Sequence, residues 1–203
     1  KVKEALAIAE ESGARCAINT VGSFRTESLN HHSPRNFTRE AFDAAVEIAR
    51  DIIDSVKPKR SFFVYEVLAM HIIDSPKVLA ELLSAVDRPQ FGAHMDLTNL
   101  INCPRAYWNG GADMIREAVD LFGDRIVGAH AKDITLEDGC DTVRMNEIRP
   151  GLGCLDYTTY LRLLGNLGRD IPLMMEHLPT DSEYDLAANY IRSKAAEAGV
   201  AIT

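Results

Sequence analysis

The stretch IVGAHAKD, residues 126–133, is an apolar run that ends in three ionisable side chains. A short, near-continuous apolar run is typical of a strand that is covered on both faces, as in a parallel sheet. His130, Lys132 and Asp133 then crowd its carboxyl end. Because a buried charge is costly unless it is paired or coordinated, this strand end indicates the wall of a polar site.

Four further runs share this pattern, and amphipathic helices separate them. The strands that we expect cover residues 15–20, 61–66, 91–96, 125–131 and 171–176. Strand–helix alternation predicts an α/β fold with a parallel sheet, either a closed barrel or a doubly wound sheet. No Gly-x-Gly-x-x-Gly pattern follows a strand, which disfavours the dinucleotide-binding form of the doubly wound sheet.

Helix boundary signals support the same order of elements. Apolar side chains recur at helical spacing over residues 112–122 and 157–164. The predicted boundaries are the N-caps Thr38 and Ser75, the capping box of Thr180 and Glu183, and the helix ends at Gly13, Pro58 and Gly123. Residues 21–37 are the longest irregular segment, and segments of that length are usually functional or disordered.

The composition is that of one globular domain. The chain has 203 residues, of which 46% are apolar and 26% charged, and its formal net charge is −8. The acidic balance disfavours nucleic acid as a partner because phosphate binding needs a basic surface. No stretch approaches the roughly 18–20 apolar residues of a membrane span, so no membrane contact is expected.

The cysteines indicate the redox compartment. They lie far apart, without a CxxC pair, at Cys16, Cys103, Cys140 and Cys154. A disulfide framework is not expected in a chain of this size, and structural zinc sites use paired cysteines. The sequence therefore predicts a reducing compartment and a cytoplasmic protein.

Four of the five expected strands end in a side chain that can bind a metal ion, namely Glu66, Asp96, His130 and Glu176. Taken singly, each has a plainer interpretation, such as a solvated acid, an Asx-turn or a rim histidine. In a parallel barrel, however, the carboxyl ends of all strands surround one mouth, where active sites are built. Three carboxylates and one imidazole suit Mn²⁺, Mg²⁺ or Co²⁺ better than a structural zinc.

An ordered series of short motifs resembles a known family. The series is VYE (64–66), HMD (94–96), HAKD (130–133), RPGLGCLDY (149–157) and MMEH (174–177). It resembles the xylose isomerase-like TIM barrel family of sugar phosphate isomerases and epimerases, over nearly the whole chain. The resemblance implies a (β/α)₈ barrel of which this chain holds strands four to eight. Residues 1–203 are then a single domain without its N-terminal βα units, and weak or no turnover is expected from it alone.

The resemblance also implies a site and a reaction. One divalent cation, foremost Mn²⁺, would be held by Glu66, Asp96, His130 and Glu176. It would stabilise an enediolate of a small-molecule sugar or sugar phosphate while Glu66 and Glu176 move the proton. Association into a homo-oligomer is compatible with the resemblance but is not required by it.

Four further residues complete the substrate-binding set that we expect. Arg149 matches the substrate arginine of the family, with a surface ion pair or helix cap as the alternative. Lys132 is a second candidate, with a structural role as the alternative. Asn99 stands where ketose epimerases carry a histidine, which leaves the substrate class open. Trp108 is expected to cover the sugar, with core packing as the alternative.

Three other functions compete with the isomerase. A dehydratase of inosose or a related keto-polyol would use the same metal and the same enolate chemistry. A phosphodiesterase similar to endonuclease IV would need several zinc ions, more histidines and a basic groove. A non-catalytic sugar-binding protein would not need both glutamates. Metal analysis separates these functions, because they predict one ion, three zinc ions or none.

Overall fold

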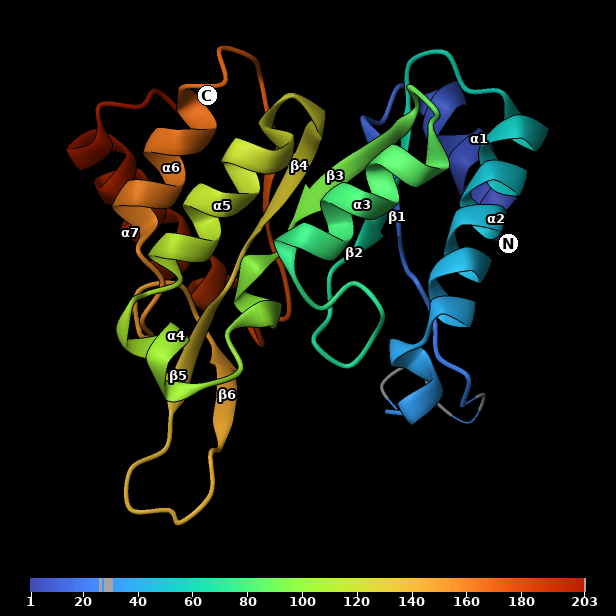
Figure 1. Cartoon of the computed structure of the whole chain (residues 1–203). Helices are drawn as coiled ribbons and strands as arrows, with labels where there is room; N and C mark the ends of the chain where they lie inside the picture. The colour runs from blue at the N-terminus through green and yellow to red at the C-terminus, as the bar shows by residue number, and fades with distance from the viewer. Residues whose placement is uncertain (26, 28–30, 203) are drawn as a thin grey trace. The chain divides into compact units, whose positions relative to one another are not determined.

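The structure, a computed structural model, is an α/β fold with one parallel sheet and a small antiparallel hairpin (Figure 1). It describes residues 1–25, 27 and 31–202. The parallel sheet has the strand order β1-β2-β3-β4-β7, and β5 pairs with β6. Its strands lie within one or two residues of the predicted ranges at each end, and the predicted partial barrel class is confirmed. The strands are β1 (Cys16–Thr20), β2 (Phe62–Glu66), β3 (Phe91–Met95), β4 (Ile126–Ala131), β5 (Asp133–Leu136), β6 (Met145–Ile148) and β7 (Leu173–Met175).

The helices fall between the strands, as the alternation predicts. The α-helices are α1 (Val2–Ser12), α2 (Arg39–Val56), α3 (Pro76–Val86), α4 (Pro104–Trp108), α5 (Ala112–Phe122), α6 (Tyr157–Gly165) and α7 (Asp181–Ala198), and the 3₁₀ helices are η1 (Pro34–Phe37), η2 (Leu97–Leu100) and η3 (Gly123–Arg125). Among the residues described, no helix combines the length and the apolar character that crossing a membrane requires.

The chain divides into two compact units, of which the first comprises Lys1–Met95 and Arg125–Gly128. Here β1, β2 and β3 run parallel, with Thr20 opposite Glu66. The core includes Phe63 and Phe91, which are fully buried, and each such side chain contributes about 2 kcal/mol by leaving water. Gly92 allows β3 and β4 to approach closely, because a Cβ there would lie 2.7 Å from a methyl group of Val127.

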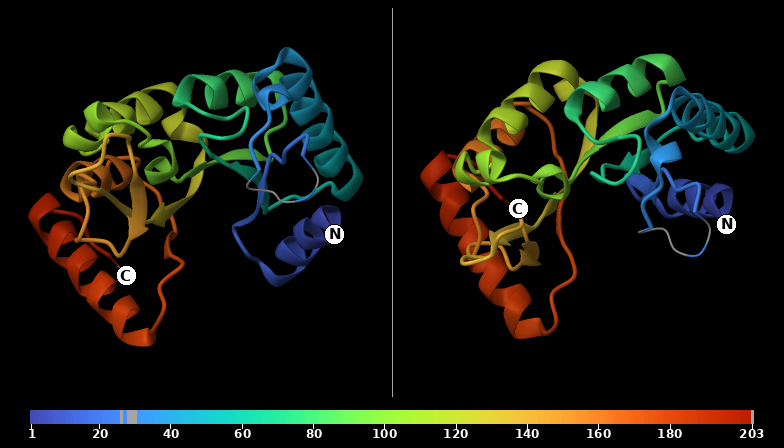
Figure 2. Two further views of the ribbon diagram at one scale, coloured as in Figure 1. Left: turned by 90° about the horizontal axis from the view of Figure 1, so that it is seen from below. Right: turned by 60° about the horizontal axis from the view of Figure 1, so that its bottom comes forward.

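The second unit comprises Asp96–Asp124 and Ala129–Thr203. In it the end of β4 pairs in parallel with β7, with His130 opposite Met174. Helices α6 and α7 lie side by side (Figure 2). Both carry buried apolar side chains, such as Leu161 and Ile191. The prediction that residues 1–203 form a single domain stays a prediction.

The β5–β6 hairpin was not expected from the sequence. Its strands pair antiparallel, from Asp133 opposite Ile148 to Leu136 opposite Met145. Both strands have four residues, of which two are apolar, so they lack the continuous apolar run by which the other strands were recognised. The hairpin carries Glu147, which becomes important for the candidate site.

The predicted helix boundaries are confirmed, and one correction concerns the segment 21–37. Thr38, Ser75 and Thr180 accept hydrogen bonds from backbone N–H groups in the first turns of their helices. Gly123 is the C-cap of α5, as predicted; its φ is −53°, so the cap is right-handed and the chain continues into η3. The segment 21–37 is not wholly irregular, because η1 occupies its end; residues 26 and 28–30 lie outside the described residues.

Candidate metal centre

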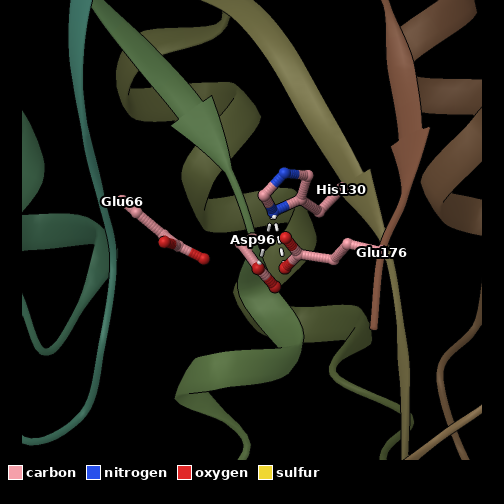
Figure 3. A group of neighbouring side chains, drawn as sticks. All are labelled: Glu66, Asp96, His130 and Glu176. Atoms are coloured by element: carbon pink, nitrogen blue, oxygen red, sulfur yellow. Dashed lines mark hydrogen bonds and ion pairs between the residues drawn. The ribbon is translucent and has the colours of Figure 1, made fainter. Parts of the chain in front are cut away.

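The candidate metal ligands lie at the carboxyl ends of four parallel strands. Glu66 is the last residue of β2, and His130 is the last but one of β4. Asp96 and Glu176 come directly after β3 and β7. Glu66 belongs to the first unit, whereas Asp96, His130 and Glu176 all belong to the second, where Figure 3 shows them side by side.

Within the second unit, three of these side chains are in direct contact. His130 Nδ1 lies 2.9 Å from Asp96 Oδ2 and 3.2 Å from Glu176 Oε1, as the dashed lines in Figure 3 mark. Asp96 is fully buried and His130 is 8% exposed, while the Glu176 side chain is one quarter exposed. Two carboxylate oxygens and one imidazole nitrogen therefore form a compact triangle of donor atoms.

The burial of Asp96 gives an independent test of whether a cation fits. Among the described residues, its Oδ1 atom is buried without a hydrogen-bond partner. Such an atom costs free energy unless something else satisfies it, and a bound cation would do so. Burial raises the pKa of Asp96, although the hydrogen bond with His130 and the charge of Lys132 oppose the rise. The donor set, two carboxylates and an imidazole in contact, is suited to a divalent cation.

Lys132 lies among the same carboxylates. Its side chain is 3% exposed, and its ammonium nitrogen is 2.9 Å from Asp96 Oδ2 and in contact with Glu176 Oε1. It also lies 3.5 Å from Asn99 Oδ1. Burial alone would lower the pKa of Lys132, but Asp96, Glu176 and Glu147 raise it above the ordinary value, so the side chain is cationic.

Glu147 and His177 lie next to this cluster and contact each other, a contact that the sequence did not predict. Glu147 on β6 places Oε2 3.6 Å from Lys132 Nζ and Oε1 2.9 Å from His177 Nδ1. The His177 side chain is 63% exposed and has a left-handed φ of 59°, whereas His94 is fully buried. The sequence signal for Glu147 was weak, because the hairpin that carries it was not predicted.

Helix α6 and η2 hold the backbone at the end of β4. Tyr160 donates its hydroxyl hydrogen to the carbonyl oxygen of His130 at 3.2 Å, and Tyr157 donates to that of Lys132 at 2.8 Å. Thr98 also donates to the Lys132 carbonyl, at 3.3 Å. Burial raises the pKa of both tyrosines, so both keep their donor hydrogens. Residues that are not candidate ligands therefore hold the main chain of His130 and Lys132 in position.

The remaining predicted residues differ in their surroundings. Asn99 lies beside Lys132, as described above. Arg149 donates from Nε to Glu183 Oε2 at 2.7 Å, in the first turn of α7, which matches the ion-pair alternative. Trp108, on the short helix α4, is 78% exposed, so its core-packing alternative is wrong. The substrate-binding roles of these residues stay predictions.

With the fold and the geometry in place, the family can be assigned. A model of the xylose isomerase-like TIM barrel family matches residues 1–194. The chain belongs to this family. In the comparison with curated proteins, none matches the sequence.

Solved structures with the same fold include proteins of different chemistry. A xylose isomerase-like TIM barrel protein from Mycobacterium smegmatis, in complex with magnesium, is 18% identical with a TM-score of 0.72, over 97% of this chain and 66% of that one. D-psicose 3-epimerase from Clostridium cellulolyticum, with D-tagatose, is 14% identical with a TM-score of 0.68, over 98% and 70%. Endonuclease IV from Thermus thermophilus is 14% identical with a TM-score of 0.69, over 97% and 67%.

These likenesses show the fold alone. The chain spans about two thirds of the length of the solved structures that it matches, with 66% of the Planctomyces limnophilus xylose isomerase domain protein as an example. The family and most matched proteins are enzymes, and magnesium is bound in one of them. A divalent cation therefore fits both the donor atoms of this chain and the fold that carries them.

Proposed function

We propose that this protein is a divalent-metal-dependent isomerase or epimerase of a sugar or sugar phosphate. The observation that carries the proposal is the contact of His130 Nδ1 with Asp96 Oδ2 at 2.9 Å and with Glu176 Oε1 at 3.2 Å, and we propose Glu66 as the fourth ligand. The unpartnered Asp96 Oδ1 and the membership in the xylose isomerase-like family support it. We propose Mn²⁺ as the ion, with Mg²⁺ and Co²⁺ as alternatives, because the set is rich in oxygen.

The ion would supply Lewis-acid stabilisation of the enediolate oxygens of the substrate. Asp96 and His130, both buried, are assigned to holding the ion. Glu66 and Glu176 are each partly exposed, so we assign the proton transfer to these two carboxylates. One would remove the proton from the carbon next to the carbonyl group and the other would return it, to the opposite face in an epimerase.

Substrate contacts are proposed for Arg149, Lys132, Asn99 and Trp108. Lys132 and Asn99 are supported by position, because Lys132 contacts Asp96 and Glu176 and the side-chain oxygen of Asn99 lies 3.5 Å from Lys132 Nζ. Trp108 is exposed and can cover a sugar ring, whereas Arg149 would have to exchange Glu183 for a substrate oxygen or phosphate. A cytoplasmic location agrees with the four cysteines, all of which are free thiols.

Solvent exchange of the substrate proton tests the reaction class. The protein with Mn²⁺ is incubated in D₂O with a panel of ketoses, ketose phosphates and inososes, and the products are followed by NMR. Epimerisation or isomerisation places solvent deuterium on the carbon next to the carbonyl group. Loss of water from an inosose would instead support the keto-polyol dehydratase, and neither change with any substrate would contradict both.

Variants of the two glutamates test their roles. In Glu66→Gln and Glu176→Gln, deuterium incorporation should fall at least about 100-fold, because each lacks one proton carrier. Glu197→Gln, which changes a surface acid paired with Lys194, is the matched control and should be active. Cleavage of an abasic-site DNA duplex with three bound zinc ions would replace the proposal by an endonuclease-like function.

A further inference from the structure

Lys132 contacts the same oxygen atoms that the proposed ion would use. The donor triangle consists of Asp96 Oδ2, Glu176 Oε1 and His130 Nδ1. The ammonium group of Lys132 is bound to both oxygens of this triangle, at 2.9 Å from Asp96 Oδ2 and in close contact with Glu176 Oε1. A metal ion and the ammonium group therefore have overlapping requirements for these two atoms.

We propose that Lys132 competes with the metal ion for the ligand carboxylates. Without the ion, the ammonium group of Lys132 holds these carboxylates together, and it must be displaced when the ion binds. The inference rests on the proposed function, since it concerns regulation of the same site. A divalent cation and an ammonium group repel each other strongly at such distances in a buried site, so both cannot occupy the two oxygens. The measured metal affinity then includes the cost of moving Lys132.

The surroundings of Lys132 provide a place for the displaced ammonium group. Glu147 Oε2 lies 3.6 Å from Nζ, on the side of the β5–β6 hairpin, and is itself 38% exposed. The backbone of Lys132 is fixed by Tyr157 and Thr98, so only the side chain has to move. A small rotation of the side chain would exchange Asp96 and Glu176 for Glu147 as the partner of the charge.

The charge balance explains why such a competitor would matter. Asp96, Glu176 and Glu147 place three carboxylates around one ammonium group. Carboxylates this close repel one another without a cation, and burial of Asp96 increases the cost. Lys132 keeps the triangle assembled before the ion arrives, and it excludes cations that bind too weakly to displace it.

Metal titration of a charge-deleted variant tests the proposal. Isothermal titration with MnCl₂ compares the wild-type protein, Lys132→Met and Lys132→Arg, with Lys194→Met as the control for loss of a surface lysine. Lys132→Met should bind Mn²⁺ about tenfold more tightly, while its metal-free form melts at a lower temperature. Lys132→Arg, which keeps the charge, and Lys194→Met should not gain affinity. Equal or weaker binding by Lys132→Met would overturn the proposal.

A measurement on the wild-type protein keeps the proposal testable if Lys132→Met does not fold. The buried ammonium group is followed by ¹⁵N NMR of the lysine side chains during titration with MgCl₂. Saturation should shift the Lys132 resonance as the group changes partners, and an unchanged resonance at saturation would overturn the competitor role alone. If the folded wild-type protein binds neither Mn²⁺ nor Mg²⁺, the proposed metal-dependent function fails, and the competitor role fails with it.

Discussion

Asp96, which follows β3, and Asp133, which begins β5, are both buried carboxylates, but their partners differ in kind. Asp133 accepts backbone N–H groups, from Ile134 and Leu155 on Oδ1 and from Gly151 on Oδ2. Asp96 faces two titratable side chains on Oδ2, and its Oδ1 has no hydrogen-bond partner among the described residues.

The comparison shows that burial of an acid does not by itself indicate a site. A carboxylate satisfied by backbone N–H groups organises the fold, because those groups exist in every loop and carry no chemistry. A carboxylate that faces other ionisable side chains and keeps an unsatisfied oxygen is organised for a ligand. Burial raises the pKa of both residues, so the direction of the shift does not separate them, whereas the partners do.

The largest expected effect is on stability, at Asp133. In Asp133→Ala, three N–H groups, of which that of Leu155 is buried, lose their acceptor, and the free energy of unfolding should fall by about 3 kcal/mol or more. Urea denaturation followed by circular dichroism measures it. Asp156→Ala, which removes only the cap of α6, is the control and should cost about 1 kcal/mol. Equal losses in the two variants would mean that Asp133 is no more than another cap.

A substitution of Asp96 should lower metal affinity strongly and stability only slightly, the reverse of what is expected at Asp133. In Asp96→Asn, affinity for Mn²⁺ should fall about 100-fold, because a charged ligand is lost, while the free energy of unfolding changes by no more than about 1 kcal/mol. Titration calorimetry and urea denaturation of the same preparation measure both quantities. Asp113→Asn, at an exposed acid of α5, is the control. If Asp96→Asn unfolds as readily as Asp133→Ala, the contrast between the two aspartates fails.

Gly153 tests how closely the backbone packs around the Asp133 carboxylate. A Cβ on Gly153 would overlap Asp133 Oδ1 and the carbonyl oxygen of Ile134. Gly153→Ala should therefore lower the free energy of unfolding by about 2 kcal/mol, with no loss of metal affinity per folded molecule. Gly139→Ala, where a Cβ meets open space, should cost about 1 kcal/mol from its left-handed backbone alone. Urea denaturation compares the two, and equal costs would argue against such close packing.

The smallest effect is expected at Glu10, a surface counterpart of Asp133. Its Oε2 accepts the N–H groups of Ser61 and Arg60, which lower the pKa of Glu10 from 4.5 to about 2. Because the pKa in the folded state is the lower one, this contribution to stability is present above pH 4.5 and is lost as the pH falls toward 2.

Denaturant titrations of the wild-type protein and Glu10→Gln between about pH 7 and pH 3 measure this dependence. The variant should be less stable at neutral pH, and the difference should shrink as the pH falls. Glu11→Gln, at the exposed neighbouring acid, should follow the wild-type profile. A difference between wild type and Glu10→Gln that is the same at every pH would assign the effect of Glu10 to packing rather than to its charge.

Periodic features of the sequence predicted most of the fold. The five parallel strands were recognisable because each is a short apolar run between capped helices, and the caps of Thr38, Ser75 and Thr180 are local hydrogen bonds. The candidate ligands followed from their recurrence at strand ends. The β5–β6 hairpin was missed because its short strands mix apolar and polar residues and form no continuous apolar run, and Glu147 was missed with it.

Partner choice was the part that spacing could not predict. Arg149, Glu183 and Lys132 each have several oppositely charged groups along the sequence, and only the packed chain decides which one is near. Glu183 was expected to complete a capping box, and its carboxylate instead accepts the hydrogen bond from Arg149. The positive φ of His177 likewise accompanies a contact with Glu147, 30 residues away in the chain.

His130 and Lys132 each use the backbone carbonyl group and the side chain for different partners. The carbonyl groups are bound by the helix, through Tyr160 and Tyr157, while the side chains contact the cluster of acids. Tyr160→Phe would keep every donor atom of the candidate site. It would remove the hydrogen bond to the carbonyl group of His130, which holds the backbone that orients the imidazole. A substitution in α6, outside the set of donor atoms, can therefore change the orientation of the His130 imidazole while the donor atoms themselves stay the same.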